Sequence, residues 1–147
     1  MYRGQYLQDE ILNNQFFKNK RGGTFLDIGA DNGVALNNTY FYERELGWKG
    51  ILFEPNTDMY LEAVKNRINP VMNVALSNKD GMVKYTRIRG YSRMLSGITE
   101  TYDPKYNDPD GRINSEIRDM GGSREELEIV ALKLDTVLDM FQIKDVD

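Results

Sequence analysis

Two carboxylates and two glycines stand at the ends of successive apolar runs, where they could hold a cofactor. Asp27 ends the first run and is followed by Gly29 and Gly33, and Glu54 ends the second run, Gly50-Ile51-Leu52-Phe53. Glycines allow a tight turn whose bare backbone lies against a ligand. A carboxylate accepts hydrogen bonds from ribose hydroxyls. These residue types therefore predict a site for a nucleotide-like cofactor.

The spacing of the glycines distinguishes between two classes of cofactor. The pattern from Asp27 to Gly33 is D-x-G-x-x-x-G, whereas dinucleotide-binding loops have the pattern G-x-G-x-x-G. A pyrophosphate needs closely spaced glycines so that backbone amides can surround it. S-adenosylmethionine has no phosphate and carries a sulfonium cation and an amino-acid tail. We therefore favour S-adenosylmethionine, and an NAD-dependent oxidoreductase half-domain remains the alternative.

The segments around these motifs predict a parallel sheet that carries them at one edge. Strands and helices alternate with short connections, and this order favours parallel pairing with right-handed crossovers. The fold class is therefore α/β, with a Rossmann-like sheet whose first two strands end near Asp27 and Glu54. The strands are predicted at 25–28, 51–53 and 71–76, and the helices at about 36–46 and from Asn56 or Thr57 onward.

An amphipathic helix is predicted before the first strand, over residues 5–18. Leu7 pairs with Ile11, and Leu12 pairs with Phe16, at the i,i+4 spacing of one helix face. An amphipathic helix normally buries its apolar face, which would leave Gln8 and Asp9 facing solvent.

The second half of the chain has a different character. Strand-like runs at 83–88 and 129–134 flank residues 90–125, which contain most of the Gly and Pro loop signals. Asp135 is predicted to cap a short last helix. Residues 82–128 are therefore expected to form a loop-rich insert within a single domain that spans residues 1–147.

Composition excludes several classes of function. The net charge of −4 argues against nucleic-acid or anionic-membrane binding, which needs clustered Lys and Arg. The chain has no Cys and no His, so it lacks thiolate chemistry and the commonest general base. No apolar run approaches the roughly 20 residues of a membrane span, and the N-terminus has no signal-peptide core. We expect a soluble, cytoplasmic protein.

Two charged clusters in the second half have less specific interpretations. Three acids in the insert lack the ligand register of a calcium loop, so we expect solvated turn acids and no metal site. Four arginines could face an acidic or phosphorylated acceptor, or form a solvated surface. The acids are Asp103, Asp108 and Asp110, and the arginines are Arg87, Arg89, Arg93 and Arg112.

Seven short sequence motifs occur in an order typical of one family. They are Phe25-Leu26-Asp27-Ile28-Gly29-Ala30, Asn38-Thr39-Tyr40-Phe41, Glu45-Leu46-Gly47-Trp48-Lys49-Gly50, Phe53-Glu54-Pro55-Asn56, Ala75-Leu76-Ser77-Asn78-Lys79-Asp80-Gly81, Leu95-Ser96-Gly97-Ile98 and Leu134-Asp135-Thr136. Through them nearly the whole chain resembles the FkbM-type methyltransferases. The resemblance implies a class I, S-adenosylmethionine-dependent O-methyltransferase that acts on a hydroxyl of a sugar, a glycan or a related small metabolite.

The resemblance also implies which residues bind the cofactor, in four groups. One group forms the first cofactor loop, Glu54 binds the ribose, a third group flanks the adenine, and a fourth closes over the methionine end. The loop residues are Asp27, Gly29, Ala30, Asp31 and Gly33, the adenine residues are Ala75, Leu76 and Ser77, and the methionine-end residues are Gln8, Asp9, Asn38 and Thr39.

The chain departs from the family pattern at two places. Asp31-Asn32 stands where the family more often has Asn-Asp, which should shift one polar contact. The chain also ends at Asp147, where the family begins a fourth strand and an Asp-x-Glu-Gly motif. The first strand would then have an unpaired edge, so we expect a longer natural chain, a partner chain at this edge, which in a homo-oligomer is a second copy, or a reduced relative of the family. No catalytic residue can be assigned, and an incomplete cofactor-binding or assembly module remains the alternative.

Overall fold

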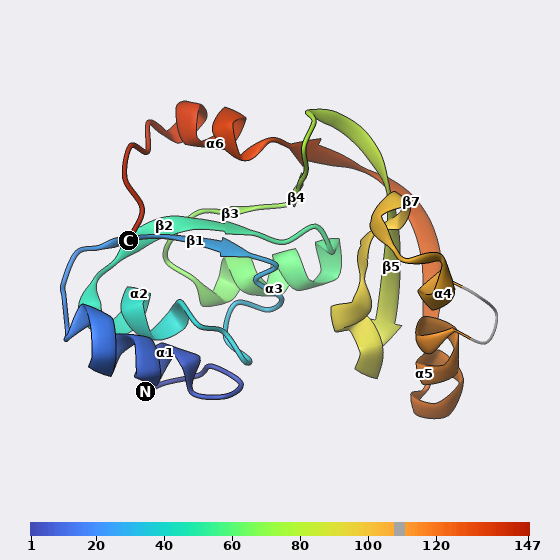
Figure 1. Cartoon of the computed structure of the whole chain (residues 1–147), viewed down its shortest axis with the longest axis horizontal. Helices are drawn as coiled ribbons and strands as arrows, with labels where there is room; N and C mark the ends of the chain where they lie inside the picture. Colours follow the sequence, from blue (N-terminus) through green and yellow to red (C-terminus); the bar gives the residue numbers. More distant parts are fainter. Residues whose placement is uncertain (108–110) are drawn as a thin grey trace.

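Two β-sheets and six α-helices make up the part of the chain that the computed structural model describes, residues 1–107 and 111–147 (Figure 1). The elements are α1 (Gln8–Leu12), a π-helical turn η1 (Asn13–Phe17), β1 (Thr24–Ile28), α2 (Tyr40–Leu46), β2 (Lys49–Phe53), α3 (Thr57–Asn66), β3 (Val71–Met72), β4 (Ala75–Leu76), β5 (Gly81–Gly90), a 3-10 turn η2 (Tyr91–Leu95), β6 (Gly97–Ile98), a 3-10 turn η3 (Thr99–Thr101), α4 (Pro104–Asn107), α5 (Arg112–Met120), β7 (Gly122–Leu132) and α6 (Leu134–Phe141).

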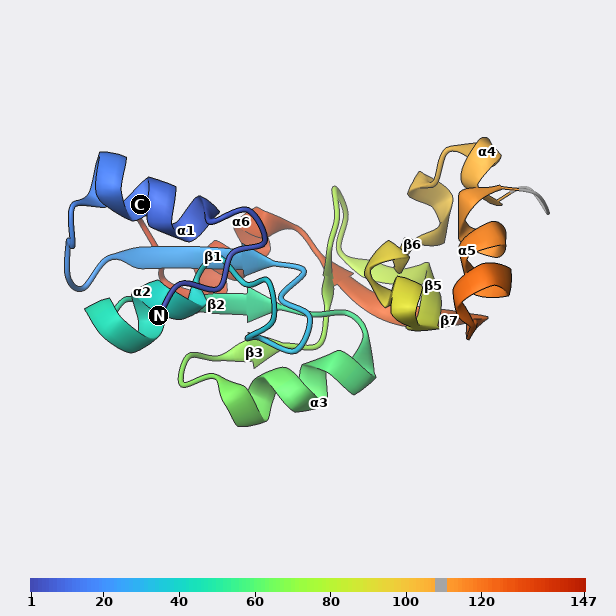
Figure 2. The ribbon, with the colours of Figure 1, turned by 90° about the horizontal axis from the view of Figure 1, so that it is seen from below.

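The first sheet has the order β1-β2-β3, and all of its strands are parallel. Helices α1, α2 and α3 lie on one side of this sheet and α6 lies on the other (Figures 1 and 2). Phe25 packs with Trp48 and the α2 aromatics on the first side, while Ile51 and Phe53 pack against Val137 of α6 on the second. The predicted α/β, Rossmann-like fold is confirmed.

The third strand is shorter than predicted. The prediction of one strand over 71–76 is wrong, because β3 ends at Met72 and β4 joins the second sheet beside β7. Pro55 has no N–H, so it cannot extend the ladder beyond Glu54. The side chain of Asn73 instead donates to the carbonyls of Glu54 and Pro55, at 2.8 and 3.1 Å. The chain therefore leaves the first sheet at Asn73.

The N-terminal helix exposes the face that we expected it to bury. Leu7, Ile11 and Phe16 are all exposed, whereas Asp9 and Asn13 are buried. The buried amide of Asn13 donates to Tyr2 and to Asn19, so its polar groups are satisfied inside the protein. Periodicity finds the helix, but these hydrogen bonds decide which face turns inward.

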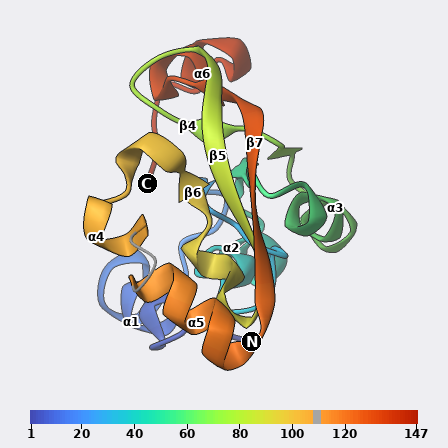
Figure 3. The same cartoon turned by 90° about the vertical axis from the view of Figure 1, so that its right-hand side faces the viewer.

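The region predicted to be loop-rich is mostly regular structure. β5 and β7 form a long antiparallel pair from Gly81–Ala131 to Gly90–Gly122, as Figure 3 shows. The helices α4 and α5 and the short strand β6 lie between them along the chain. Both strands are longer than predicted because the cross-strand ladder continues through their polar ends.

Two predicted helix starts are also displaced. The helix predicted at about 36 begins at Tyr40, because Asn37 accepts hydrogen bonds from the backbone N–H groups of Thr39 and Tyr40. Asp135 lies in the first turn of α6 and is not its cap. The side chain of Asp80 instead binds the start of this helix: its carboxylate accepts a hydrogen bond from the backbone N–H of Lys133, at 2.7 Å.

Candidate functional site

The glycine turn lies at the carboxyl end of β1, beside the end of β2. The N–H groups of Gly29 and Ala30 both donate to the carbonyl of Phe53, at 2.9 and 3.1 Å. Gly29 has a φ of 77°, a conformation that side-chain-bearing residues rarely adopt. A Cβ added at Gly29 would meet no atom within 4 Å. The bare backbone of Gly29 therefore faces open space, as a ligand-binding turn requires.

Glu54 connects the end of β2 to this turn. Its carboxylate accepts from the N–H of Asp31 at 2.7 Å and from the N–H of Asn56 at 2.8 Å. Glu54 is only 6% exposed, and this burial raises its pKa above the ordinary value although both hydrogen bonds oppose the shift. Each carboxylate oxygen keeps acceptor capacity for a ligand hydroxyl.

Asp27 is held by a polar network behind the turn. Its Oδ2 accepts from Thr39 Oγ1 at 2.6 Å and from Asn37 Nδ2 at 2.8 Å. Its Oδ1 accepts no hydrogen bond from the residues that the structure describes, and Asp27 lines a cavity beside Gly29. Asp27 therefore has one oxygen committed to the protein and one available to a ligand.

Arg67 is the centre of this network, and the sequence analysis missed it. Its fully buried guanidinium donates to Glu43, to the carbonyl of Gly33 and to Thr39, at 3.1, 3.1 and 2.9 Å. A Cβ at Gly33 would lie 2.8 Å from the side chain of Arg67. Gly33 is therefore needed for close packing with Arg67 as well as for its own φ of 78°. The only sequence signal is a basic residue after a helix end.

Three small cavities meet at Gly29, with volumes of about 140, 140 and 190 Å³. Each is smaller than the roughly 300–1,000 Å³ of pockets that enclose drug-sized ligands, but together they reach that range. The first is lined by Glu54, the second by Asp27, and the third by Phe53 and Leu76. We call these three cavities the Gly29 crevice.

Eight of the predicted residues line the Gly29 crevice. They are Asp27, Gly29, Ala30, Asp31, Asn38, Glu54, Ala75 and Leu76. Ser77 does not line it, because its backbone N–H pairs with Leu132 in the second sheet. Gly33 and Thr39 lie behind it, in contact with Arg67. Residues that were not predicted to bind the cofactor also line it, among them Asn37, Tyr85, Arg93 and Met94.

Gln8 and Asp9 line none of these three cavities and shape the N-terminal loop instead. Asp9 accepts from the backbone N–H groups of Arg3 and Gly4 at 2.6 and 3.0 Å, and Gln8 accepts from the N–H of Tyr6 at 2.8 Å. Gly4 pairs with Leu36. The loop therefore lies beside the segment that leads to Asn38. A role of Gln8 and Asp9 at the methionine end stays a prediction.

Arginine from the insert reaches the glycine turn. Arg93 of η2 forms two hydrogen bonds with the carboxylate of Asp31, at 3.0 and 2.8 Å. Arg87 and Arg89 pair with Glu125, and Arg112 pairs with Glu116. The four arginines considered as a surface for an acidic acceptor are thus ion-paired with acids of this chain.

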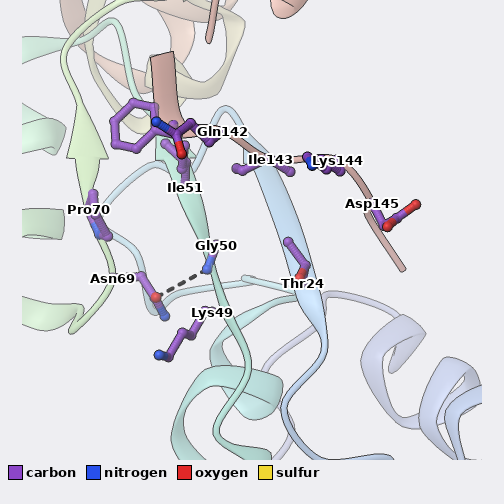
Figure 4. A pocket seen from close by; sticks show the side chains of 11 residues that line it. Thr24, Lys49, Gly50, Ile51, Asn69, Pro70, Gln142, Ile143, Lys144 and Asp145 are labelled. Carbon is purple, nitrogen blue, oxygen red and sulfur yellow. Dashed lines mark hydrogen bonds between the residues drawn. The ribbon is translucent and has the colours of Figure 1, made fainter. Parts of the chain in front are cut away.

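A larger cavity of about 520 Å³ lies at the opposite, amino end of the strands. Figure 4 shows it between the starts of β1 and β2 and the segment after α6, with Thr24, Lys49 and Ile143 on its walls. It has no glycine turn and no buried carboxylate. Ligands of open parallel sheets bind outside the carboxyl ends of the strands, so we place the functional site in the Gly29 crevice.

Within residues 1–107 and 111–147, no group of three acidic, His or Cys side chains could hold a metal ion. Asp108 and Asp110 lie outside the described residues. In the same part of the chain, no helix has the length and hydropathy needed to cross a bilayer.

Comparison with known proteins identifies one related family. The family model described as "Methyltransferase FkbM domain" matches residues 27–147, so it includes the glycine turn, Glu54 and the whole insert. Gln8 and Asp9 precede the matched region. No curated protein and no solved structure matches the chain.

Proposed function

The chain belongs to the FkbM methyltransferase family, and from this premise we propose that it binds S-adenosylmethionine in the Gly29 crevice. We further propose that it methylates a hydroxyl of a sugar, a glycan or a related small metabolite. The observation that carries the proposal is the bare backbone of Gly29 between the carboxylates of Asp27 and Glu54.

The residues of the crevice fit the three parts of this cofactor. Glu54 offers carboxylate oxygens to the ribose hydroxyls, and the apolar side chains of Phe53 and Leu76 offer a surface to the adenine. We assign the amino-acid tail to Asp27 Oδ1 and to the exposed side chain of Asn38. When bound, S-adenosylmethionine supplies an electrophilic methyl group.

The protein contributes alignment and exclusion of water to such a transfer. Arg93 and Met94 of η2 cover the crevice from the side of the insert, and the Arg93–Asp31 ion pair holds them there. Tyr85 is buried in the wall, and this burial raises its pKa far above the ordinary value, so its hydroxyl stays protonated near neutral pH. Tyr85 is therefore unsuited to act as the general base.

One observation favours a second candidate function, assembly through the first sheet. Within the described residues β1 pairs along its length only with β2, and its other edge meets only Asp147, at Thr24. An open edge is a template for pairing with another chain. We therefore propose a homo-oligomer as the alternative arrangement. If light scattering shows a monomer at all concentrations, the homo-oligomer is excluded.

Calorimetric titration tests the proposed cofactor. We expect S-adenosylmethionine and S-adenosylhomocysteine to bind with one site per chain, and NAD to give no measurable heat at the same concentrations. The pyrophosphate of NAD should be disfavoured, because the D-x-G-x-x-x-G turn lacks the third glycine of dinucleotide sites. Tighter binding of NAD than of S-adenosylhomocysteine would overturn the proposal.

Cofactor binding is also expected to depend on pH through Glu54. Burial raises its pKa above the ordinary value of 4.5, so the protonated form persists to a higher pH than for an exposed glutamate. Ribose hydroxyls donate better to the ionised form, and binding therefore releases a proton. Affinity for S-adenosylhomocysteine should rise over the pH interval above 4.5 that contains the raised pKa of Glu54, and then level off. A Glu54→Gln variant should show a flat profile over this interval.

A further inference from the structure

Counted with the three cavities of the Gly29 crevice, a fourth cavity lies beside η2, and it contains none of the predicted cofactor residues. It has a volume of about 340 Å³. Its walls come from η2 and the serine that follows it, from α5, and from the tyrosine that follows η3. The lining residues are Met94, Leu95, Ser96, Tyr102, Arg112 and Ile113.

Met94 joins this cavity to the crevice. The Met94 side chain lines the fourth cavity, the Glu54 cavity and the Asp27 cavity, and the residue is 61% exposed. An unbranched thioether adopts several conformations at little cost. Movement of this one side chain would therefore connect the fourth cavity with the part of the crevice next to Asp27.

Hydrogen bonds hold the walls of the fourth cavity in place. The buried hydroxyl of Ser92 in η2 donates to Glu116 of α5 at 2.9 Å, and Arg112 donates to the other oxygen of Glu116 at 2.7 Å. Tyr102 donates its hydroxyl proton to the carbonyl of Leu95. Burial raises the pKa of Tyr102 to about 12, so this donor stays protonated at neutral pH. These hydrogen bonds therefore fix the shape of the cavity within the insert.

The chemistry of the walls indicates what the cavity holds. Met94, Leu95 and Ile113 are apolar, and the hydroxyls of Tyr102 and Ser96 already donate to backbone carbonyls. The remaining lining residue, Arg112, is ion-paired with Glu116. A ring with many hydroxyls would find few free hydrogen-bond partners on these walls. An apolar group has no hydrogen bonds to water that it would give up on entering the cavity. We infer that this cavity binds the apolar part of the methyl acceptor, whose hydroxyl then points past Met94 toward Asp27. This inference rests on the proposed methyltransferase function.

The test uses 8-anilino-1-naphthalenesulfonate, whose fluorescence reports binding to apolar surface. We compare the unmodified chain with Leu95→Trp, which fills the cavity, and with Leu61→Trp, a matched change at an exposed leucine of α3. Leu95→Trp should weaken the saturable binding of the probe by roughly tenfold or more, an effect of about 1.4 kcal/mol. Leu61→Trp should bind the probe as the unmodified chain does.

Parallel titration with S-adenosylhomocysteine separates the two proposals. Leu95 does not line the Gly29 crevice, so Leu95→Trp should keep the cofactor affinity of the unmodified chain. If Leu95→Trp fails to fold, Met94→Trp repeats the probe measurement at an exposed side chain. If the folded variant binds the probe as tightly as the unmodified chain, the proposal that this cavity binds the acceptor is overturned. Absence of S-adenosylhomocysteine binding in the unmodified chain overturns the proposed function instead.

Discussion

Replacement of Glu54 by alanine is expected to weaken binding of S-adenosylhomocysteine by roughly 30- to 100-fold, or about 2–3 kcal/mol. The change removes the acceptor proposed for the ribose hydroxyls. It also leaves the buried N–H groups of Asp31 and Asn56 without their partner, which loosens the glycine turn. Calorimetric titration of the folded variant measures the loss.

Glu128→Ala is the matched control for this measurement. Glu128 is an exposed glutamate of β7 that lies opposite Lys84 of β5 and lines none of the cavities described above. Its replacement should leave cofactor affinity within about twofold, as is usual for surface substitutions. If Glu54→Ala binds S-adenosylhomocysteine as tightly as Glu128→Ala, Glu54 does not contact the ribose.

Replacement of Arg67 by methionine is expected to lower the free energy of unfolding by about 3–5 kcal/mol. The Arg67 side chain is fully buried and pairs with Glu43, whose side chain is 1% exposed. Methionine keeps much of the volume but leaves the Glu43 carboxylate buried without its cation. Urea denaturation followed by circular dichroism measures the change. Arg44→Met, which removes a partly exposed arginine 3.9 Å from the same carboxylate, should cost less than about 1 kcal/mol.

The ion pair between Arg67 and Glu43 should also make the stability of the protein depend on pH. Burial alone would raise the pKa of Glu43, but hydrogen bonds from Arg67, from the N–H of Ile68 and from Asn69 lower it below the ordinary value of 4.5. The stabilisation is therefore present above pH 4.5 and is lost as the pH falls through the lowered pKa. In Arg67→Met, the free energy of unfolding should no longer fall over this acidic pH range. If the free energy of unfolding of the variant still falls as in the unmodified chain, the pH dependence does not come from the Arg67–Glu43 pair.

Local sequence signals were sufficient for the centre of the site. The apolar runs that end at Asp27 and Glu54 are short and bounded by Gly and Pro, so their parallel pairing and the turn at Gly29 followed from composition and order. Trp48, between two glycines, is buried against Phe17 and Tyr42. These features depend on neighbours in the chain.

Features that depend on distant partners could not be predicted in the same way. Arg67 contacts Glu43 and Asp27, which are 24 and 40 residues away in sequence. The outward face of α1 follows from the buried Asp9, which pairs with the N-terminal backbone. Met94 borders the crevice because the β5–β7 ladder brings η2 back to the first sheet. Periodicity contains no information about such contacts.

A crystal structure with S-adenosylhomocysteine tests the central claim most directly. The proposal predicts that the adenosyl group lies in the Gly29 crevice, with a ribose hydroxyl about 2.6–3.0 Å from the Glu54 carboxylate and the amino-acid tail beside Gly29. Density for the ligand in the cavity between Lys49 and Ile143, with the Gly29 crevice empty, would contradict it.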